Sequence, residues 1–600
     1  MPCFQLQRVR TNLSLLSLSF INEFTAVCQE KSTHEIIEVT NKDLNSVSRG
    51  PDHSVSPPSS TIALSSFLRR LRSSPRSQGL LKIKDYTCRW IWKILNKNKP
   101  SRSVQCPGIP ADGCDVGQIP IDILPDEVLL GIFDHYVGIF DHYVYEANMK
   151  NRWVTLVHVC QRWRNVGFGS PCRLNLQLVC SDKTPVRRTL DIWPPLPIII
   201  IQYFDPARGM DNILAALEHV DRISRITLTQ VPTAQMEKVV PAMQKPFPAL
   251  THLQLTSSET PLVAADIILG GPVPRLRVLT LDGISFRGLP KLLLSTTDLV
   301  VLDLGRIPHS AYISPETMVM NLSRLTRLLF LCLGFKSPQS RPHQERRRPP
   351  PPTRTVLFAL KSFLFRGASE YLEDLVSRID TPQVDVWSIT FFHQLIFDTP
   401  QLTQFISRIP TLKAHDQAQA RLVFYERHIC VTFPLTPCGV FALGMSCKQL
   451  DWQLSSMAQI CISSFPQALP LTVDHLYILE SSGSQPHWLD DIDNSQWLEI
   501  LRPFTTVKNL YLSKELARRV VPSLQELVGG RATELLPALQ SLFLEELHPS
   551  GLVEEAIGRF VGVRQSSNHP IAVSPWKRGN PPLWILRTPE DYPFSMFLED

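Results

Sequence analysis

Residues 276–281 read Leu-Arg-Val-Leu-Thr-Leu, and residues 299–304 read Leu-Val-Val-Leu-Asp-Leu. In both stretches the first, fourth and sixth side chains are apolar. Side chains two residues apart point to the same side of an extended strand. Each stretch therefore predicts a short strand whose fourth and sixth residues enter a common core. The same pattern recurs at Ile223/Ile226/Leu228, Leu250/Leu253/Leu255, Leu328/Leu331/Leu333, Leu360/Phe363/Phe365, Val384/Trp387/Ile389, Val473/Leu476/Ile478, Val507/Leu510/Leu512 and Leu539/Leu542/Leu544.

The spacing of these copies indicates a repeat architecture. The first seven begin 27, 26, 23, 29, 32 and 24 residues apart, which is typical of irregular leucine-rich repeats. The residues between copies often have the pattern of a helix, as in 369–379 and 400–409. One repeat cannot bury its own inner side chains, so stacking of neighbours makes the core. We therefore predict an α/β fold with an irregular leucine-rich-repeat solenoid over residues 198–575.

Two segments interrupt the predicted solenoid. Residues 337–355 contain Arg346–Arg348 followed by Pro349–Pro352, a composition that predicts an exposed polyproline-like loop. This loop is either a solvated insertion or a ligand for a partner that recognises proline-rich segments. Residues 420–433 alternate apolar and polar side chains around a short polar turn, which predicts a β-hairpin that breaks the solenoid.

The alternation of side chains along each strand also predicts a binding surface. The residue between the two inward positions points to the opposite, open side of the sheet. Four of these residues, Asp303, Tyr477, Tyr511 and Phe543, are the predicted target-binding residues. The aromatic members have no reason to be exposed unless something covers them. The alternative is that the C-terminal tail, residues 576–600, folds over this row. The other members of the row are Thr227, Gln254, Thr280, Cys332 and Ser388.

A different pattern precedes the repeats. Residues 123–133 read Ile-Leu-Pro-Asp-Glu-Val-Leu-Leu-Gly-Ile-Phe, and residues 159–163 read Val-Cys-Gln-Arg-Trp. Pro125 suits the first turn of a helix, and the two acids after it suit the positive helix end. Apolar residues then recur at helical spacing, and Leu156, Val159, Cys160 and Trp163 form a second stripe. We interpret residues 118–180 as a small helical domain in which Cys160 is a buried structural thiol.

The order Leu-Pro-x-Glu-Val-Leu-x-x-Ile-Phe, then Val-Cys-x-x-Trp, resembles the F-box. That resemblance implies docking onto the Skp-type adaptor of an SCF-type (cullin-RING) ubiquitin ligase. Further stretches, such as Pro246–Leu250 and Ile307–Pro315, are similar to a large family of fungal F-box proteins with degenerate leucine-rich repeats. The resemblance covers residues 118–575 and implies an intracellular, cytoplasmic or nuclear, substrate receptor. The adaptor-binding residues that it implies are Leu124, Pro125, Val128, Leu129, Ile132, Phe133, Val159, Cys160 and Trp163.

One feature departs from the F-box pattern. Residues 131–137, Gly-Ile-Phe-Asp-His-Tyr-Val, are repeated at once as residues 138–144. Seven residues are nearly two helical turns, so a helix could lengthen and keep its apolar side in phase. Alternatively, one copy loops out at a glycine. An F-box needs one copy only, and the second copy opens the alternative of a repeat scaffold that no longer engages the adaptor.

Composition excludes several classes of protein. The net charge of the 600 residues is +6, and residues 69–102 hold eleven Lys or Arg and one acid. The remainder is near neutral, so we do not expect nucleic-acid binding. Thirteen cysteines without a Cys-x-x-Cys pair argue for a reducing compartment. No apolar run is long enough for a transmembrane helix. Residues 1–117 lack a periodic pattern, which predicts a mostly disordered N-terminal extension.

The sequence contains no motif of known catalytic chemistry. The nearest candidate is an acid cluster at Asp490, Asp491 and Asp493, close to His487. It could serve a hydrolase, although acids before a helix at 496–501 more often stabilise the helix start. We therefore expect no catalytic residue, no metal and no cofactor. The predicted function is that of a receptor joining the adaptor and cullin complex to a target protein.

Overall fold

The chain divides into Met1–Gly117 and Gln118–Asp600, and all residues described by the computed structural model belong to the second part. The predicted disordered extension, the second Gly-Ile-Phe-Asp-His-Tyr-Val copy from residue 139 onward and the acid cluster at 490–493 lie outside the described residues. The described ranges are 124–138, 153–171, 173–181, 185–202, 209–258, 261–263, 268–337, 349, 351–392, 397–410, 419–425, 428–434, 439–446, 450–463, 473–481, 494–527, 531–545 and 551–577.

Three short helices open the described part. They are α4 (Asp126–Gly138), α5 (Trp153–Val157) and α6 (Gln161–Gly169). As predicted, α4 starts directly after Pro125 and carries two acids in its first turn, where they favour the positive end of the helix. The core of these helices continues into the following segment, because Leu174, Leu176, Leu178 and Leu196 belong to the same buried cluster.

The sheet that follows has 16 strands in the order β1-β2-β3-β4-β6-β8-β9-β11-β13-β16-β15-β14-β17-β18-β19-β20. All ten predicted repeats form strands of this sheet, so the predicted solenoid is confirmed. The bounds are β1 (Leu178–Ser181), β2 (Ile198–Gln202), β3 (Ile223–Val231), β4 (His252–Ser257), β6 (Val278–Asp282), β8 (Val301–Ile307), β9 (Phe330–Phe335), β11 (Ser362–Gly367), β13 (Val386–Phe392), β14 (Gln419–Phe424), β15 (His428–Pro434), β16 (Val440–Ser446), β17 (His475–Glu480), β18 (Asn509–Leu512), β19 (Ser541–Glu545) and β20 (Ala572–Trp576).

The sheet begins and ends outside the predicted limits of the solenoid. Strand β1 pairs in parallel with β2, so the sheet starts at Leu178 and not at residue 198. Strand β20 pairs in parallel with β19 and ends at Trp576. Neither end strand carries the full apolar pattern, because each has only one neighbour with which to share a core.

The hairpin prediction needs a correction. Strands β14 and β15 are antiparallel as expected, but the hairpin does not break the solenoid. Strand β16, which was not predicted, pairs antiparallel with β15 and parallel with β13. Strand β14 pairs in parallel with β17. One reversed strand between two forward strands restores the direction of the chain, so the sheet continues without a gap.

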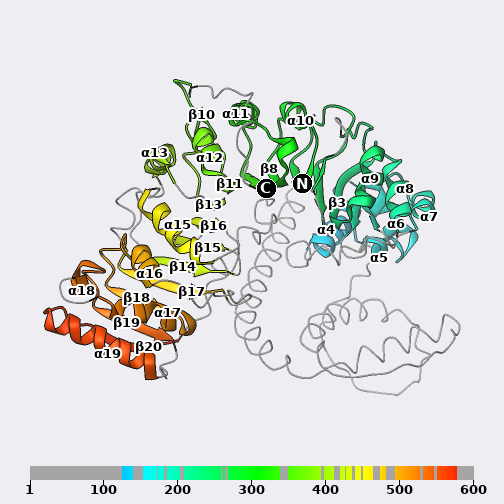
Figure 1. Ribbon diagram of the computed structural model, residues 1–600. Coiled ribbons are helices and arrows are strands. Elements are labelled where there is room, and N and C mark those ends of the chain that lie inside the picture. The colour runs from blue at the N-terminus through cyan, green and yellow to red at the C-terminus, as the bar shows by residue number, and fades with distance from the viewer. Residues whose placement is uncertain are drawn as a thin grey trace, which may run out of the picture. The chain divides into compact units, whose positions relative to one another are not determined.

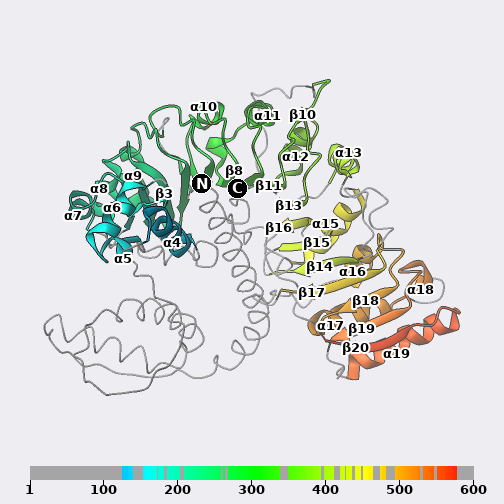
Figure 2. The same cartoon turned by 180° about the vertical axis from the view of Figure 1, so that it is seen from behind.

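Helices connect most of the parallel strands and lie against one face of the sheet. Figures 1 and 2 show α10, α11 and α12 on the same side of the strands in both views. The bounds of these helices are α7 (Val186–Ile192), α8 (Met210–Leu217), α9 (Thr233–Ala242), α10 (Leu289–Ser295), α11 (Pro315–Leu322), α12 (Ser369–Val376), α13 (Pro400–Arg408), α15 (Leu450–Ser463), α16 (Asn494–Leu501), α17 (Lys514–Gln525), α18 (Arg531–Glu534) and α19 (Gly551–Ser566), with a 3-10 turn at His309–Ala311.

Two small parallel pairs lie outside the main sheet. Strand β5 (Leu262–Val263) pairs with β7 (Ile284–Ser285), and β10 (Thr355–Val356) pairs with β12 (Ile379–Asp380). The second pair anchors the end of the Pro/Arg-rich segment, of which residues 338–348 and 350 lie outside the described residues. Residues 351–354 are exposed as predicted, and the Pro349 carbonyl accepts a hydrogen bond of 3.2 Å from Arg378 Nη1.

The core lies between the sheet and its helices. In each repeat the two inward side chains are fully buried; Leu279 is 0% and Leu281 is 1% exposed. One continuous buried cluster runs from Cys180 in β1 to Ile571 next to β20. Burying one leucine contributes about 1.5–3 kcal/mol, and each repeat depends on its neighbours for that burial. We call the other side of the sheet the second face.

Truncating one inward side chain should show this dependence. Leu510 in β18 is fully buried, whereas its neighbour Asn509 is half-buried on the second face. We expect Leu510→Ala to lower the free energy of unfolding by about 2–5 kcal/mol. The control Asn509→Ala should change it by less than about 1 kcal/mol. Urea denaturation of both variants measures the difference, and equal losses would show that the strand faces are assigned incorrectly.

Candidate protein-binding surfaces

The three-helix unit buries only part of the predicted adaptor-binding set. Leu129 and Phe133 are 0% exposed, and the Phe133 ring lies 4.9 Å from the Trp163 ring. These side chains hold α4 against α6 and cannot also face a partner. Because each packs inside the unit, they are positioning residues and not contact residues.

The remaining apolar members of the set are exposed. Val128 is 45%, Ile132 39% and Val159 41% exposed. Pro125, also exposed, precedes Val128 and Ile132 at spacings of three and seven residues, so the three lie along one side of α4. Leu124 is half-buried against the core of the unit. A short helix thus presents a strip of exposed apolar side chains beside its buried face.

The second apolar stripe is corrected by the structure. Helix α5 ends at Val157, so Leu156, Val159, Cys160 and Trp163 do not share one helix. Cys160 is exposed and not a buried thiol; its Sγ caps α6 by accepting a hydrogen bond of 3.5 Å from the Trp163 amide. The helix starts there because a side-chain acceptor satisfies an amide that has no partner within the first turn.

A cation fixes the start of α4 relative to α6. Arg162 Nη2 donates to Asp126 Oδ1 at 2.7 Å and also to the Leu124 carbonyl. The ion pair is partly exposed, so its Coulomb energy is modest. Its role is geometric, because it orients the residues that precede Val128 and Ile132.

The second face of the sheet carries a continuous row of side chains in register. The predicted members pair in sequence across β3, β4, β6, β8 and β9. The row continues through the reversed strand, so the predicted register is confirmed. The complete row is Ser181, Ile201, Thr227, Gln254, Thr280, Asp303, Cys332, Leu364, Ser388, Ala442, Thr432, Arg421, Tyr477, Tyr511, Phe543 and Ser574.

Burial divides this row into two parts. Toward the N-terminus, Thr227 is 1%, Thr280 3% and Leu364 4% exposed. Val278, Val301 and Phe330 add to a second buried apolar cluster there. From Arg421 to Ser574 every member is half-buried. In the N-terminal part Gln254, Asp303 and Cys332 are half-buried between buried members, whereas from Ala442 to Ser574 the half-buried members follow one another without interruption.

Asp303 is half-buried and lies in the row between buried Thr280 and half-buried Cys332. Burial raises the pKa of this carboxyl to about 7, a hydrogen bond with Cys332 lowers it, and the nearby charge of Asp282 raises it further. A carboxyl with a raised pKa is costly to ionise. The Asp303 side chain is half-buried, as those of Tyr477 and Tyr511 are, so Asp303 stays a candidate target-binding residue.

The three predicted aromatic residues form one stack. The rings of Tyr477 and Tyr511 lie 4.3 Å apart with a 12° angle, and those of Tyr511 and Phe543 lie 4.5 Å apart with a 7° angle. Neighbouring strands are about 4.8 Å apart, so residues in register on three parallel strands place their rings face to face. The Arg421 Cζ lies 5.4 Å from the Tyr477 ring centre. We call Arg421, Tyr477, Tyr511 and Phe543 the aromatic ladder.

One residue of the predicted C-terminal tail, Trp576, covers part of this row. Trp576, the last residue of β20, lies edge-on to Tyr511 at 5.6 Å and to Tyr477 at 6.3 Å. Its Nε1 donates to the Leu512 carbonyl at 3.2 Å. The ladder rings nevertheless remain half-exposed. Residues 578–600 lie outside the described residues.

Stacking also changes an expectation from sequence. Aromatic pairs of this geometry contribute about 0.5–1.5 kcal/mol each beyond their buried area. Replacing Tyr477 and Tyr511 by alanine would therefore reduce stability as well as remove binding groups. Variants that keep the ring or change Arg421 test binding more cleanly.

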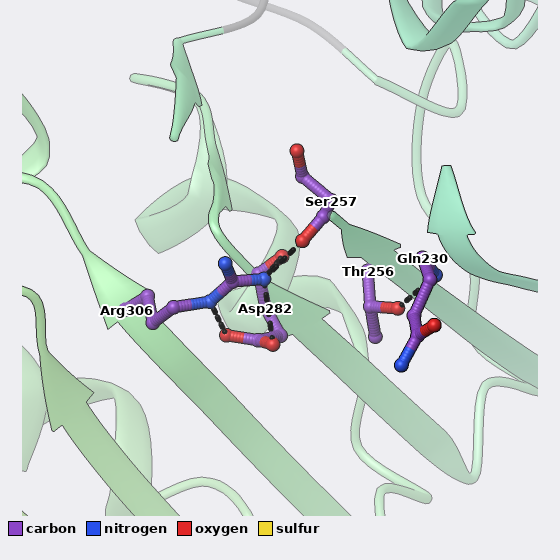
Figure 3. Close-up of polar contacts among 5 residues, drawn as sticks. All are labelled: Gln230, Thr256, Ser257, Asp282 and Arg306. Carbon is purple, nitrogen blue, oxygen red and sulfur yellow. Dashed lines mark hydrogen bonds and ion pairs between the residues drawn. The ribbon is translucent and has the colours of Figure 1, made fainter. Parts of the chain in front are cut away.

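A polar cluster at the ends of β4, β6 and β8 is structural. Figure 3 shows the Arg306 guanidinium bonded to the Asp282 carboxylate and to the Ser257 carbonyl at the end of β4. The two bonds to Asp282 measure 2.7 and 2.8 Å. Arg306 has a φ of 45° at a bulge in β8, as Gln230 has a φ of 53° at a bulge in β3. The hydrogen bonds of Arg306 join β8 to β6 and β4, so this cluster holds the ends of the three strands together.

Sequence reasoning missed two residues of the ladder region. Arg421 lies in the hairpin, whose position in the sheet depends on a strand that no pattern predicted. Trp576 was placed in the tail because the last strand has no leucine repeat. An alternating stretch at 440–446, Val-Phe-Ala-Leu-Gly-Met-Ser, was the signal that could have revealed the third antiparallel strand.

Comparison with known proteins adds little to this description. No family model matches the chain, and no curated protein matches it. Among solved structures it is similar to the leucine-rich repeat-containing protein LegL7 from Legionella pneumophila. The identity is 14%, the TM-score is 0.25, and the alignment covers 56% of this chain and 98% of that chain. The assignment of an α/β solenoid resembling leucine-rich-repeat proteins rests on the strand order and register above.

Within the described part of the chain no group of three or more potential metal ligands occurs. No helix of the described ranges is long and apolar enough to cross a membrane. No disulfide joins the described cysteines, which are Cys160, Cys180, Cys332, Cys430 and Cys461.

The glycine after Leu304 should prove essential to the Arg306 cluster. A Cβ on Gly305 would lie 2.7 Å from Asp282 Oδ1, whereas a Cβ on Gly334, one strand further, would meet nothing closer than 3.6 Å. We expect Gly305→Ala to lower the free energy of unfolding by about 1–3 kcal/mol and Gly334→Ala to have little effect. Urea denaturation measures the unfolding midpoint of both variants, and an unchanged midpoint for Gly305→Ala would contradict this packing.

Asp303 should make stability depend on pH. Its folded pKa of about 7 lies above the value of about 3.9 in an unfolded chain, so the folded protein holds this proton more tightly. The stabilisation is complete below pH of about 4 and is lost as pH rises through about 7. Asp303→Asn should therefore gain stability relative to wild type between pH 5 and pH 8. Urea denaturation of both proteins at pH 5 and pH 8 measures this gain. If the difference in the free energy of unfolding between Asp303→Asn and wild type is the same at the two pH values, the assignment is refuted.

Proposed function

We propose that this chain is a substrate receptor of an SCF-type ubiquitin ligase. In this proposal α4, α5 and α6 bind the Skp-type adaptor, and the second face of the C-terminal repeats binds a target protein. The mechanism is proximity: one chain holds the ligase and the target together. Ubiquitin transfer belongs to the partner subunits, so the chain itself needs no catalytic residue, metal or cofactor.

The observation that supports the proposal most is the exposed strip on α4. A unit of three short helices that buried all its large apolar residues would have no need of a partner. Here Val128 and Ile132 are about two-fifths exposed, directly beside buried Leu129 and Phe133. Exposed apolar residues grouped in this way are typical of interaction sites. The strip also carries residues that the F-box resemblance implies for adaptor binding, namely Pro125, Val128 and Ile132.

A second candidate function is a repeat scaffold without ligase activity. The second Gly-Ile-Phe-Asp-His-Tyr-Val copy favours it, because the copy begins at Gly138, the last residue of α4. An insertion there separates the two F-box signatures by seven extra residues. The two candidates differ in one property, which is binding to the adaptor. A hydrolase based on Asp490–Asp493 is the weakest alternative, since acids just before a helix more often stabilise the helix start.

Replacing the exposed strip tests the receptor function. Val128→Ser with Ile132→Ser removes two aliphatic groups that adaptor binding would bury, each contributing about 1.5–3 kcal/mol when fully buried. We expect adaptor affinity, measured by calorimetry with the purified Skp-type adaptor, to fall at least about tenfold. The thermal midpoint should stay nearly unchanged because both side chains are exposed in the free chain.

The matched control is Ile192→Ser with Ile462→Ser. These isoleucines are 62% and 61% exposed and lie on α7 and α15, outside the three-helix unit. The control should bind the adaptor as wild type does. If wild type itself shows no adaptor binding, the scaffold alternative replaces the receptor. If both double variants bind equally well, the strip on α4 is not the adaptor site.

A further inference from the structure

The aromatic ladder offers a partner a particular set of chemical groups. The three rings are stacked on each other. Their faces therefore contact neighbouring rings, and their edges are left to contact a partner. The edge of an aromatic ring carries the positive part of its quadrupole. The Arg421 guanidinium stands at one end of the stack, and two tyrosine hydroxyls can donate along it. All of these groups favour negative charge.

Burial strengthens that preference. It lowers the pKa of Arg421 and raises the pKa of Tyr511. A carboxylate stabilises a guanidinium that has lost water more than it stabilises a fully hydrated guanidinium. The Tyr511 phenol keeps its proton and can donate a hydrogen bond. His475 Nδ1 lies 3.4 Å from the Tyr511 hydroxyl, which adds a group that can accept or donate.

A second cation lies on the same face toward the N-terminus. Arg366 in β11 is exposed, its Cζ lies 5.9 Å from the Phe392 ring centre, and its Nη2 donates to Ser446 Oγ at 3.4 Å. Burial and the charge of Arg366 lower the pKa of His428 to about 4. His428, which pairs with Ser446 in the sheet, therefore stays neutral near Arg366.

Acids are scarce on this part of the face. Among the described second-face residues of β14 and of β17 to β20, the acid is Glu545, at the end of β19. Its carboxylate accepts a hydrogen bond of 3.3 Å from the Lys514 amide at the start of α17, where a helix start stabilises it. The exposed part of the second face is therefore positive near Arg366 and Arg421.

The separation of the two arginines fits an extended chain. Strands β11, β13, β16, β15 and β14 are consecutive in the sheet, so four strand spacings of about 4.8 Å place Arg421 about 19 Å from Arg366 across the sheet. An extended segment advances about 3.3 Å per residue and covers this distance in about six residues. That span is too long for one small anion to touch both arginines.

We propose that the second face from β11 to β19 binds an extended acidic segment of a target protein. Asp or Glu side chains pair with Arg421 and Arg366, about six residues apart, and residues beyond the first pair lie along the edges of Tyr477, Tyr511 and Phe543. This inference deepens the proposed function by giving the chemistry of its target. A basic segment is disfavoured by both arginines. A phosphorylated one is disfavoured because the two arginines lie about 19 Å apart across the sheet, whereas phosphate sites usually gather several cations.

Selection from a peptide library tests the proposal with the full-length chain. Random 12-residue peptides displayed on phage are selected on the wild-type protein, and the recovered peptides are sequenced. We expect Asp and Glu to be enriched over the starting library, with pairs of acids about six positions apart. A recovered peptide is then synthesised, and its affinity is measured by fluorescence anisotropy. Enrichment of Lys and Arg, or no enrichment of acids, overturns the proposal.

Variants of the two arginines test whether the acidic segment binds to this face. Arg366→Gln with Arg421→Gln should weaken the synthetic peptide at least tenfold, and Arg421→Lys alone should weaken it less. The control is Lys508→Gln, because Lys508 is exposed at the start of β18 and paired with Asp474 at 3.1 Å; its affinity should stay within twofold of wild type. Equal binding by all variants overturns the site. Thermal denaturation confirms that each variant is folded, and Tyr511→Phe, which keeps the stack, should still lose part of the affinity.

Two further arms separate this inference from other outcomes. Inorganic phosphate at 10 mM should compete less well than the acidic peptide at equal charge; stronger competition by phosphate would mark a phosphate site and overturn the assignment. The Val128→Ser, Ile132→Ser variant should keep the acidic preference. Acidic peptides recovered by a chain that fails to bind the adaptor would refute the receptor function alone. Adaptor binding without acidic peptides would refute this inference alone.

Discussion

The fold depends on one constraint: a strand with two inward leucines cannot bury them without strands on both sides. Every repeat carries such a pair, and one buried cluster connects them from β1 to the segment before β20. The energy of each repeat is therefore shared with its neighbours. The three helices at the N-terminal end fit this logic, because their core includes Leu178 of the first strand. They close one end of the stack and share a buried cluster with its first strand.

The same alternation that builds the core also builds the second face of the sheet. When inward residues are held in register, the residues between them must be in register too. Small and polar residues occupy most of that row, but three consecutive C-terminal repeats place Tyr477, Tyr511 and Phe543 there, and the strand spacing alone brings their rings into a stack. The hairpin then sets Arg421 beside Tyr477. The ladder is thus a consequence of repeat geometry and of one irregular insertion.

Sequence patterns predicted the parts of the structure that are local or periodic. The ten strands, their inward residues, the start of α4 and the row on the second face follow from spacing alone. What they could not give depends on contacts between distant segments. Cys160 was expected to be buried, yet it caps a helix because α5 ends early. Asp303 lies in register as predicted, but the raised pKa of its carboxyl depends on neighbours that periodicity does not specify. Strand β16 has no repeat signature, so the order of the sheet around Arg421 was not predictable.

The central claim is that α4, α5 and α6 dock onto a Skp-type adaptor while the solenoid remains free for a target. Hydrogen–deuterium exchange of the full-length chain, with and without the purified adaptor, tests it most directly. The account predicts slower exchange in peptides covering 124–138 and 153–169 when the adaptor is present, with unchanged exchange in β17, β18 and β19. Unchanged exchange in the three helices, or protection confined to the solenoid, would contradict it.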